Sequence, residues 1–121
     1  MPLYHFSEDP SITTFVPRPP LAHPEQESLV WAIDEWHQPM YFTPRDCPRV
    51  LFWPLPTSKA HDLHRFWSSV SGRMVLAIEW AWFERLRTTQ IYRYTMPEES
   101  FVSLNDAGMH VSGQTIVPLR V

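Results

Sequence analysis

The stretch Leu3-Tyr4-His5-Phe6-Ser7 near the start of the chain predicts a β-strand and begins the sheet on which the fold depends. His5 and Ser7 are two residues apart, so both side chains point to the same face of that strand. An imidazole and a hydroxyl side by side form a hydrogen-bonding pair on a rigid support. The strand therefore provides both an element of the sheet and a candidate binding site.

A second stretch, Pro39-Met40-Tyr41-Phe42-Thr43-Pro44-Arg45, adds a positive charge and two aromatic rings. Pro44 restricts the backbone directly before Arg45, and a guanidinium held in this way suits bidentate contact with a phosphate. Tyr41 and Phe42 are rings of the kind that stack on an adenine or a nicotinamide. The two stretches together predict a site for a phosphate-bearing nucleotide.

The composition predicts one domain over residues 1–121 and excludes several classes of protein. The chain has 121 residues, of which 44% are hydrophobic, enough for a core of its own. A formal net charge of −3 argues against a surface that clamps nucleic acid, and leaves nucleic acid only as a target of modification. The single cysteine, Cys47, allows no intrachain disulfide and fits a reducing cytoplasm. No apolar run approaches the ~20 residues that cross a bilayer, so no membrane partner is expected.

Short apolar runs and turn residues predict the other elements of the first half. Residues 16–27 are rich in proline and predict an irregular surface loop, which carries Arg18 as a second candidate phosphate contact. Residues 29–33 predict a short buried strand, and Asp34 caps the turn of helix that follows. The continuous apolar run 50–53 predicts a central strand covered on both faces.

The second half predicts one main helix and several short strands. Residues 58–70 have the helical periodicity, with an apolar stripe of Ala60, Leu63, Phe66, Trp67 and Val70. Strands are expected at 73–79, at 91–96 with Tyr92, Tyr94 and Met96 on one face, and at the sheet edge at 115–121. Residues 80–87 fit either a continued strand or a helical turn. Several strands with one main helix indicate the α+β class.

Two resemblances to known families extend this interpretation. The segments Leu3-Tyr4-His5-Phe6-Ser7-Glu8-Asp9-Pro10-Ser11-Ile12, Val30-Trp31-Ala32-Ile33-Asp34 and Pro44-Arg45-Asp46-Cys47-Pro48-Arg49 closely resemble a small bacterial family of uncharacterised function. More distantly, the order His5-x-Ser7, then a turn, then Tyr41-Phe42-x-Pro44-Arg45 before an apolar strand is similar to the DNA-targeting ADP-ribosyltransferase toxins. This second resemblance covers the chain from Leu3 to Trp53.

The ADP-ribosyltransferase resemblance implies a fold, a cofactor and residue roles. It implies a split, mixed β-sheet and an NAD site in which His5 and Ser7 bind the nicotinamide-side ribose and amide. By the same resemblance Arg45 faces the phosphates and the reacting centre. Those enzymes also use a late glutamate, but the C-terminal region here offers Ser112-Gly113-Gln114 instead. Glu79 is the only glutamate on a predicted buried strand, so it is the candidate catalytic residue.

The functional hypothesis is binding of an ADP-containing nucleotide such as NAD, ADP-ribose or ADP, with NAD glycosidic-bond cleavage or ADP-ribosyl transfer as its catalytic form. The alternative is a non-catalytic protein-interaction module that uses the Pro-rich loop and some of the six tryptophans. Two smaller questions stay open. His61 and His64, three residues apart, fit either a metal pair or a polar helix surface, and Glu79 fits an ion pair with Arg73 or Arg93.

Overall fold

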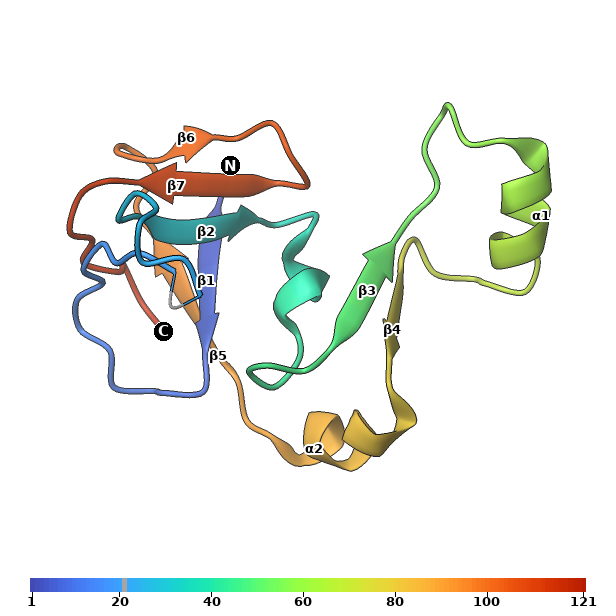
Figure 1. Cartoon of the computed structure of the whole chain (residues 1–121), viewed down its shortest axis with the longest axis horizontal. Helices are drawn as coiled ribbons and strands as arrows, with labels where there is room; N and C mark the ends of the chain where they lie inside the picture. Colours follow the sequence, from blue (N-terminus) through green and yellow to red (C-terminus); the bar gives the residue numbers. More distant parts are fainter. Residues whose placement is uncertain (21) are drawn as a thin grey trace.

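The structure is a computed structural model that describes residues 1–20 and 22–121, and it belongs to the α+β class. A main sheet has the strand order β5-β1-β2-β7-β6, and a separate two-stranded ribbon pairs β3 with β4 (Figure 1). The strands are β1 (Leu3–Ser7), β2 (Val30–Asp34), β3 (Arg49–Phe52), β4 (Val75–Ile78), β5 (Tyr92–Met96), β6 (Val102–Ser103) and β7 (Met109–Ser112). The helices are α1 (Ala60–Trp67) and α2 (Phe83–Thr88), with 3-10 turns η1 (Gln38–Tyr41) and η2 (Trp80–Trp82).

The pairing of the strands corrects one part of the prediction. The strands divide between two sheets, but every pairing between the strands of the described chain is antiparallel. The expectation of a mixed sheet is therefore wrong. A short connection requires this arrangement only for β6 and β7, which residues 104–108 join, because a parallel pair needs a crossover of a dozen or more residues.

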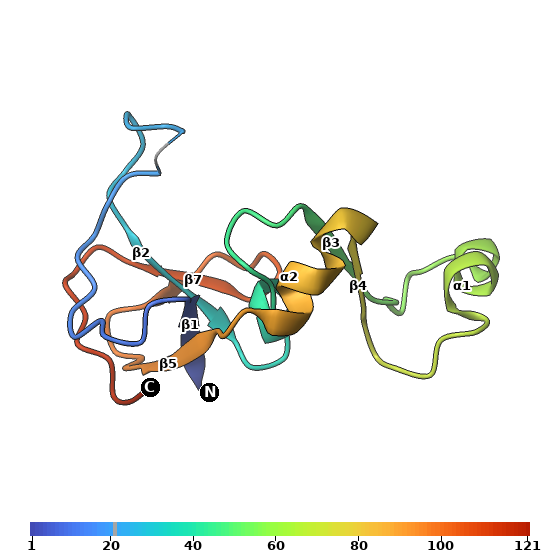
Figure 2. The same cartoon turned by 90° about the horizontal axis from the view of Figure 1, so that it is seen from below.

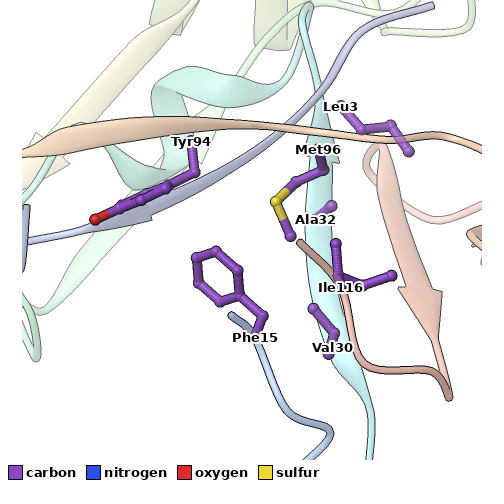
Figure 3. Close-up of a cluster of buried hydrophobic side chains, with 7 residues drawn as sticks. All are labelled: Leu3, Phe15, Val30, Ala32, Tyr94, Met96 and Ile116. Atoms are coloured by element: carbon purple, nitrogen blue, oxygen red, sulfur yellow. The ribbon is translucent and has the colours of Figure 1, made fainter. Parts of the chain in front are cut away.

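One face of the main sheet carries the hydrophobic core. Alternate residues of β1, β2 and β5 point to this face, where Phe15 and Ile116 from two flanking segments cover them. Figure 3 shows the seven side chains of the cluster: Leu3, Phe15, Val30, Ala32, Tyr94, Met96 and Ile116. Tyr94 and Met96 are almost completely buried, as the alternation of residues 91–96 predicts.

Residues 49–78, here called the arm, comprise β3, α1 and β4. Figures 1 and 2 both show the ribbon leading away from the main sheet, with α1 at its far end. Val50 is 62% exposed, and Leu51 is the one buried residue of β3. The prediction of a central strand at 50–53 is therefore wrong, because a continuous apolar run does not specify how many neighbours the strand has.

The helices lie close to where the sequence pattern predicts them, but the apolar stripe predicted for α1 is not buried. The helix predicted at 58–70 is present as α1, but none of its residues is buried. Phe52 of the ribbon packs edge-on against Phe66 and Trp67, at ring-centroid distances of 6.1 and 6.0 Å. In the segment 80–87 the structure has the helical alternative, η2 followed by α2.

Three irregular segments complete the fold. Asp9 forms a tight turn, in which its Oδ1 accepts hydrogen bonds from the Ser11 amide and hydroxyl, at 2.8 and 2.6 Å. The Pro-rich loop is irregular as predicted and is closed at its base by a bridge between Arg18 and Leu29; residue 21 within it lies outside the described residues. Residues 115–121 form isolated bridges rather than the predicted edge strand.

Candidate functional site

The two central strands of the main sheet separate after two residue pairs. β1 pairs with β5 along all five of its residues, but with β2 only at Leu3 opposite Asp34 and at Tyr4 opposite Ile33. From His5 onward the facing edges of β1 and β2 are no longer joined by the ladder. The His5 side chain spans the gap instead, because its Nδ1 lies 2.8 Å from the Trp31 carbonyl oxygen.

Two adjoining cavities lie beside the end of β1, and four residues line both of them: His5, Ser7, Asp9 and Arg45. The first, here called the turn lobe, has a volume of about 630 Å³ and is also lined by Tyr41 and Arg49. The second, the loop lobe, has a volume of about 880 Å³ and is also lined by Arg18 and Trp31. Both volumes lie within the range of about 300–1,000 Å³ that is usual for small-molecule sites.

The hydrogen bond to Trp31 fixes the chemical state of His5. A carbonyl oxygen only accepts, so Nδ1 carries the proton and Nε2 is the nitrogen that remains. Burial lowers the pKa of His5 from 6.5, since it disfavours the charged ring, although the bond to Trp31 acts in the opposite direction. At neutral pH the ring is therefore neutral, with Nε2 as a hydrogen-bond acceptor.

Ser7 presents the opposite polarity beside His5. Its Oγ accepts a hydrogen bond from the Asp9 backbone amide at 3.1 Å, which leaves the hydroxyl hydrogen for another partner. Both side chains lie on the same face of β1, as predicted from their spacing. The end of β1 thus offers one acceptor and one donor to the lobes.

Arg45 lies in a tight turn at the boundary of the two lobes. The turn is closed by the Cys47 amide, which donates to the Pro44 carbonyl at 3.2 Å, and Asp46 takes the positive φ of 66° that the turn requires. The Arg45 backbone amide donates to Glu8 Oε2 at 3.2 Å, and its exposed guanidinium makes no hydrogen bond within the described chain. The guanidinium is therefore available to an anion.

Arg49 is a second arginine of the turn lobe, which sequence reasoning missed. Its Nε donates to the Met40 carbonyl at 2.7 Å and its Nη1 to the Cys47 carbonyl at 3.1 Å. The same guanidinium lies 5.3 Å from the centre of the Tyr41 ring. Because these contacts occupy it, Arg49 braces the turn that carries Arg45. The signal in the sequence was its place two residues after Cys47, directly before an apolar run.

The two predicted aromatic residues both pack against Phe6 of β1, but they line different cavities. Tyr41 lines the turn lobe, and burial raises the pKa of its phenol, with a smaller opposing effect of the Arg49 charge. Phe42 lies outside both lobes and packs edge-on against Phe6 at 5.5 Å, in a separate shallow groove beside α2. The prediction that Tyr41 or Phe42 stacks on a base or nicotinamide stays a prediction, with Tyr41 as the ring that lines a lobe.

Glu79 lies away from the lobes. It is exposed, it follows the end of β4, and it lines neither cavity, so the expectation of a glutamate on a buried strand is wrong. Its predicted partners are engaged elsewhere: Arg73 lies over Trp36, and Arg93 donates to Gln38 Oε1 at 3.0 Å. The reason is that β4 belongs to the exposed ribbon and not to the main sheet.

The carboxylates of the turn lobe are Glu8, Asp9 and Asp46, none of which was predicted. Hydrogen bonds from the Ser11 hydroxyl and amide lower the pKa of the exposed Asp9, so this group stays ionised at neutral pH. Glu8 and Asp9 directly follow β1, and that position was the signal available in the sequence. The lobe therefore contains opposite charges close together and is not uniformly positive.

Other expectations concern metals and membranes. His61 and His64 are both exposed on α1, and the described residues contain no group of three or more His, Cys, Asp or Glu side chains that would hold a metal ion. No helix in the described part of the chain has the length and apolar character needed to cross a lipid bilayer.

The chain belongs to a family described as "Family of unknown function (DUF6886)", which matches residues 4–121. This confirms the prediction of a family whose function is uncharacterised. No curated protein and no solved structure matches the chain. The comparisons thus add no support to the resemblance to ADP-ribosyltransferases.

Proposed function

We propose that this protein binds an ADP-containing nucleotide, such as NAD, ADP-ribose or ADP, in an ADP-ribosyltransferase-like cleft between β1 and the Tyr41–Arg45 turn. The observation that carries the proposal is the shared cavity wall of His5, Ser7 and Arg45, residues from two distant parts of the chain. The loop lobe also reaches β2 at Val30 and Trp31, beyond the end of the β1–β2 ladder, and so offers backbone groups that this ladder leaves unpaired. Such groups add directional hydrogen bonds to those of the side chains.

The polarity of each group matches a different part of the ligand. His5 Nε2 needs a donor, and a ribose hydroxyl is a donor whereas an ionised phosphate is not. The phosphates therefore belong to Arg45 at the lobe boundary, with Arg18 at the wall of the loop lobe. Tyr41 supplies a ring against which a base or nicotinamide stacks.

The catalytic form of the proposal is cleavage of the NAD glycosidic bond or transfer of ADP-ribose. NAD supplies the reactive bond between nicotinamide and ribose when it is bound. With Glu79 outside the lobes, the carboxylates that line the turn lobe are Glu8, Asp9 and Asp46, of which Glu8 and Asp9 directly follow the β1 strand that carries His5. Release of nicotinamide from NAD, measured with wild type and with Asp9→Asn and Glu8→Gln variants, tests this form separately from binding.

A calorimetric titration with ADP, ADP-ribose and NAD tests the binding proposal. We expect binding of at least one of them, with Arg45→Ala weakening it about 10- to 100-fold, since hydrogen bonds to charged groups contribute about 1.5–3 kcal/mol. Arg120→Ala, which changes another exposed arginine outside both lobes, is the matched control and should bind like wild type. Absence of binding by all three nucleotides at millimolar concentration would reject the proposal.

A second candidate function is the protein-interaction module. Trp80 is 82% exposed and stacks on Phe83 at a ring distance of 5.1 Å, which leaves a flat aromatic surface open to solvent. If this function is the right one, the titrations show no nucleotide binding, and a Trp80→Ala variant loses a partner that wild type retains.

A further inference from the structure

The arm exposes apolar side chains of the kind that interaction surfaces present. Along residues 49–78, Leu51 is the one hydrophobic side chain in the core set, while Val50, Leu55 and Phe66 are exposed. The ribbon meets the rest of the described chain near η1, where Trp53 packs edge-on against Trp36 at 5.8 Å. An isolated two-stranded ribbon is at best marginally stable, and so is an eight-residue helix. The apolar side chains of the arm therefore need a cover.

Charge separates the arm from the rest of the molecule. The arm has four basic residues, Arg49, Lys59, Arg65 and Arg73, and one acidic residue, Asp62, which gives a formal charge of +3. Because the whole chain carries −3, the remaining residues carry −6. The partner that fits the arm is thus acidic and has exposed apolar groups.

A surface with acidic and exposed apolar side chains lies at the β6 edge of the main sheet. β6 is the outermost strand, with β7 as its neighbour in the sheet, and Val102 on it is 66% exposed. The segment 97–112 contains Glu98, Glu99 and Asp106 and no lysine or arginine. Glu98 is paired with the terminal amine of Met1 at 2.9 Å, which leaves Glu99 and Asp106 for another partner.

We propose that the arm of one copy docks on the β6 edge of a second copy, and that the reverse contact forms at the same time. A two-fold axis makes both contacts equivalent and closes the assembly as a dimer. The basic side chains around α1 then face Glu99 and Asp106, while Phe66 and Leu55 cover Val102 and Leu104. This assembly is independent of nucleotide binding in the lobes.

The observations favour a second copy over nucleic acid. A polyanion is repelled by the charge of −6 on the rest of the molecule, and the arm has no continuous basic stripe. A second copy instead supplies acidic and apolar groups together. Its unpaired β6 edge also suits the open edges of the ribbon, since exposed strand edges readily pair with other strands.

Sedimentation equilibrium of the full chain at low and high salt tests the proposal. We expect a dimer whose dissociation constant rises with salt, because the exposed charges that join the copies are screened. Arg65→Glu and Glu99→Arg should each weaken the dimer about tenfold or more, since each places like charges opposite one another. The chain with both substitutions should regain most of that loss.

Two further variants keep the test decisive. Phe66→Ser should weaken the dimer, whereas Val117→Ser, an equally simple change at an exposed site outside both proposed surfaces, should not. Circular dichroism shows whether each variant remains folded. A monomer at all concentrations would overturn the proposal, and so would a dimer that none of the arm variants affects. Binding of a labelled oligonucleotide that is lost in Arg65→Glu would also overturn it, in favour of nucleic acid.

Discussion

Replacing Gly108 by alanine should destabilise the fold more than any exposed substitution. Gly108 lies in the turn before β7 with a φ of +76°, a conformation that side chains of L-residues rarely adopt. A β-carbon at this position would lie 2.6 Å from Asp34 Oδ1 and would also overlap His37 Nδ1. Asp34 and His37 would then have to move apart from the turn.

The size of the effect follows from two costs. The left-handed conformation of a residue with a side chain costs about 1–2 kcal/mol. Overpacking typically adds about 1–3 kcal/mol, here because the two hydrogen bonds of 2.8 Å from His37 to Asp34 Oδ1 are disturbed. We therefore expect the free energy of unfolding to fall by about 2–5 kcal/mol.

Urea denaturation followed by circular dichroism measures this change. Gly113→Ala is the matched control, because a β-carbon there meets no atom within 4 Å, and we expect its stability to stay within about 0.5 kcal/mol of wild type. If Gly108→Ala behaves like Gly113→Ala, the close packing of the turn against Asp34 and His37 is refuted.

Three other predictions concern stability. Tyr94→Phe should cost about 1–3 kcal/mol in urea denaturation, because the buried hydroxyl donates to the Asp9 carbonyl and accepts from the Ile12 amide; a loss below about 0.5 kcal/mol would contradict this role. Burial lowers the pKa of His5, so below pH 6.5 the unfolded chain binds more protons than the folded one. The stability that the neutral His5 ring contributes is complete above pH 6.5 and is lost as the pH falls through the lower pKa of the folded state. Between these two pKa values, the urea midpoint should fall less with decreasing pH in His5→Gln than in wild type. An equal fall in both proteins would contradict a lowered pKa of His5. Ala107→Gly should stabilise the fold by up to about 1 kcal/mol, since Ala107 has a φ of 48°; an unchanged or lower urea midpoint would argue against strain there.

The strands that alternate between buried and exposed residues were predictable from local sequence. The segment 91–96 has this alternation and forms β5, which lines the core. β7 was missed because its core-facing residues are polar: Ser112 bonds to Ser100 Oγ at 2.8 Å, and His110 bonds to the Gly108 carbonyl at 3.0 Å. Partners distant from the strand satisfy Ser112, and no local pattern reveals them.

The candidate site was predictable where local geometry determines it. The common face of His5 and Ser7 follows from strand periodicity, and the rigid position of Arg45 follows from Pro44. The placement of Glu79 and Phe42 depended on tertiary structure, namely on which sheet receives β4 and on how η1 ends. The contacts of the Arg49 guanidinium with the Met40 carbonyl and the Tyr41 ring depend on how η1 folds back beside it, so residue type alone does not predict them.

Because β1 and β2 separate after Tyr4, this protein has unpaired strand edges inside its main sheet. Unpaired edges at the outside of a sheet promote aggregation, because strands of other chains can pair with them. Here the open stretch beyond Tyr4 lies in the interior of the sheet order, with β5 on one side and β7 on the other. A strand from another chain would have to enter between β1 and β2, where the His5 side chain already bonds to the Trp31 carbonyl at 2.8 Å.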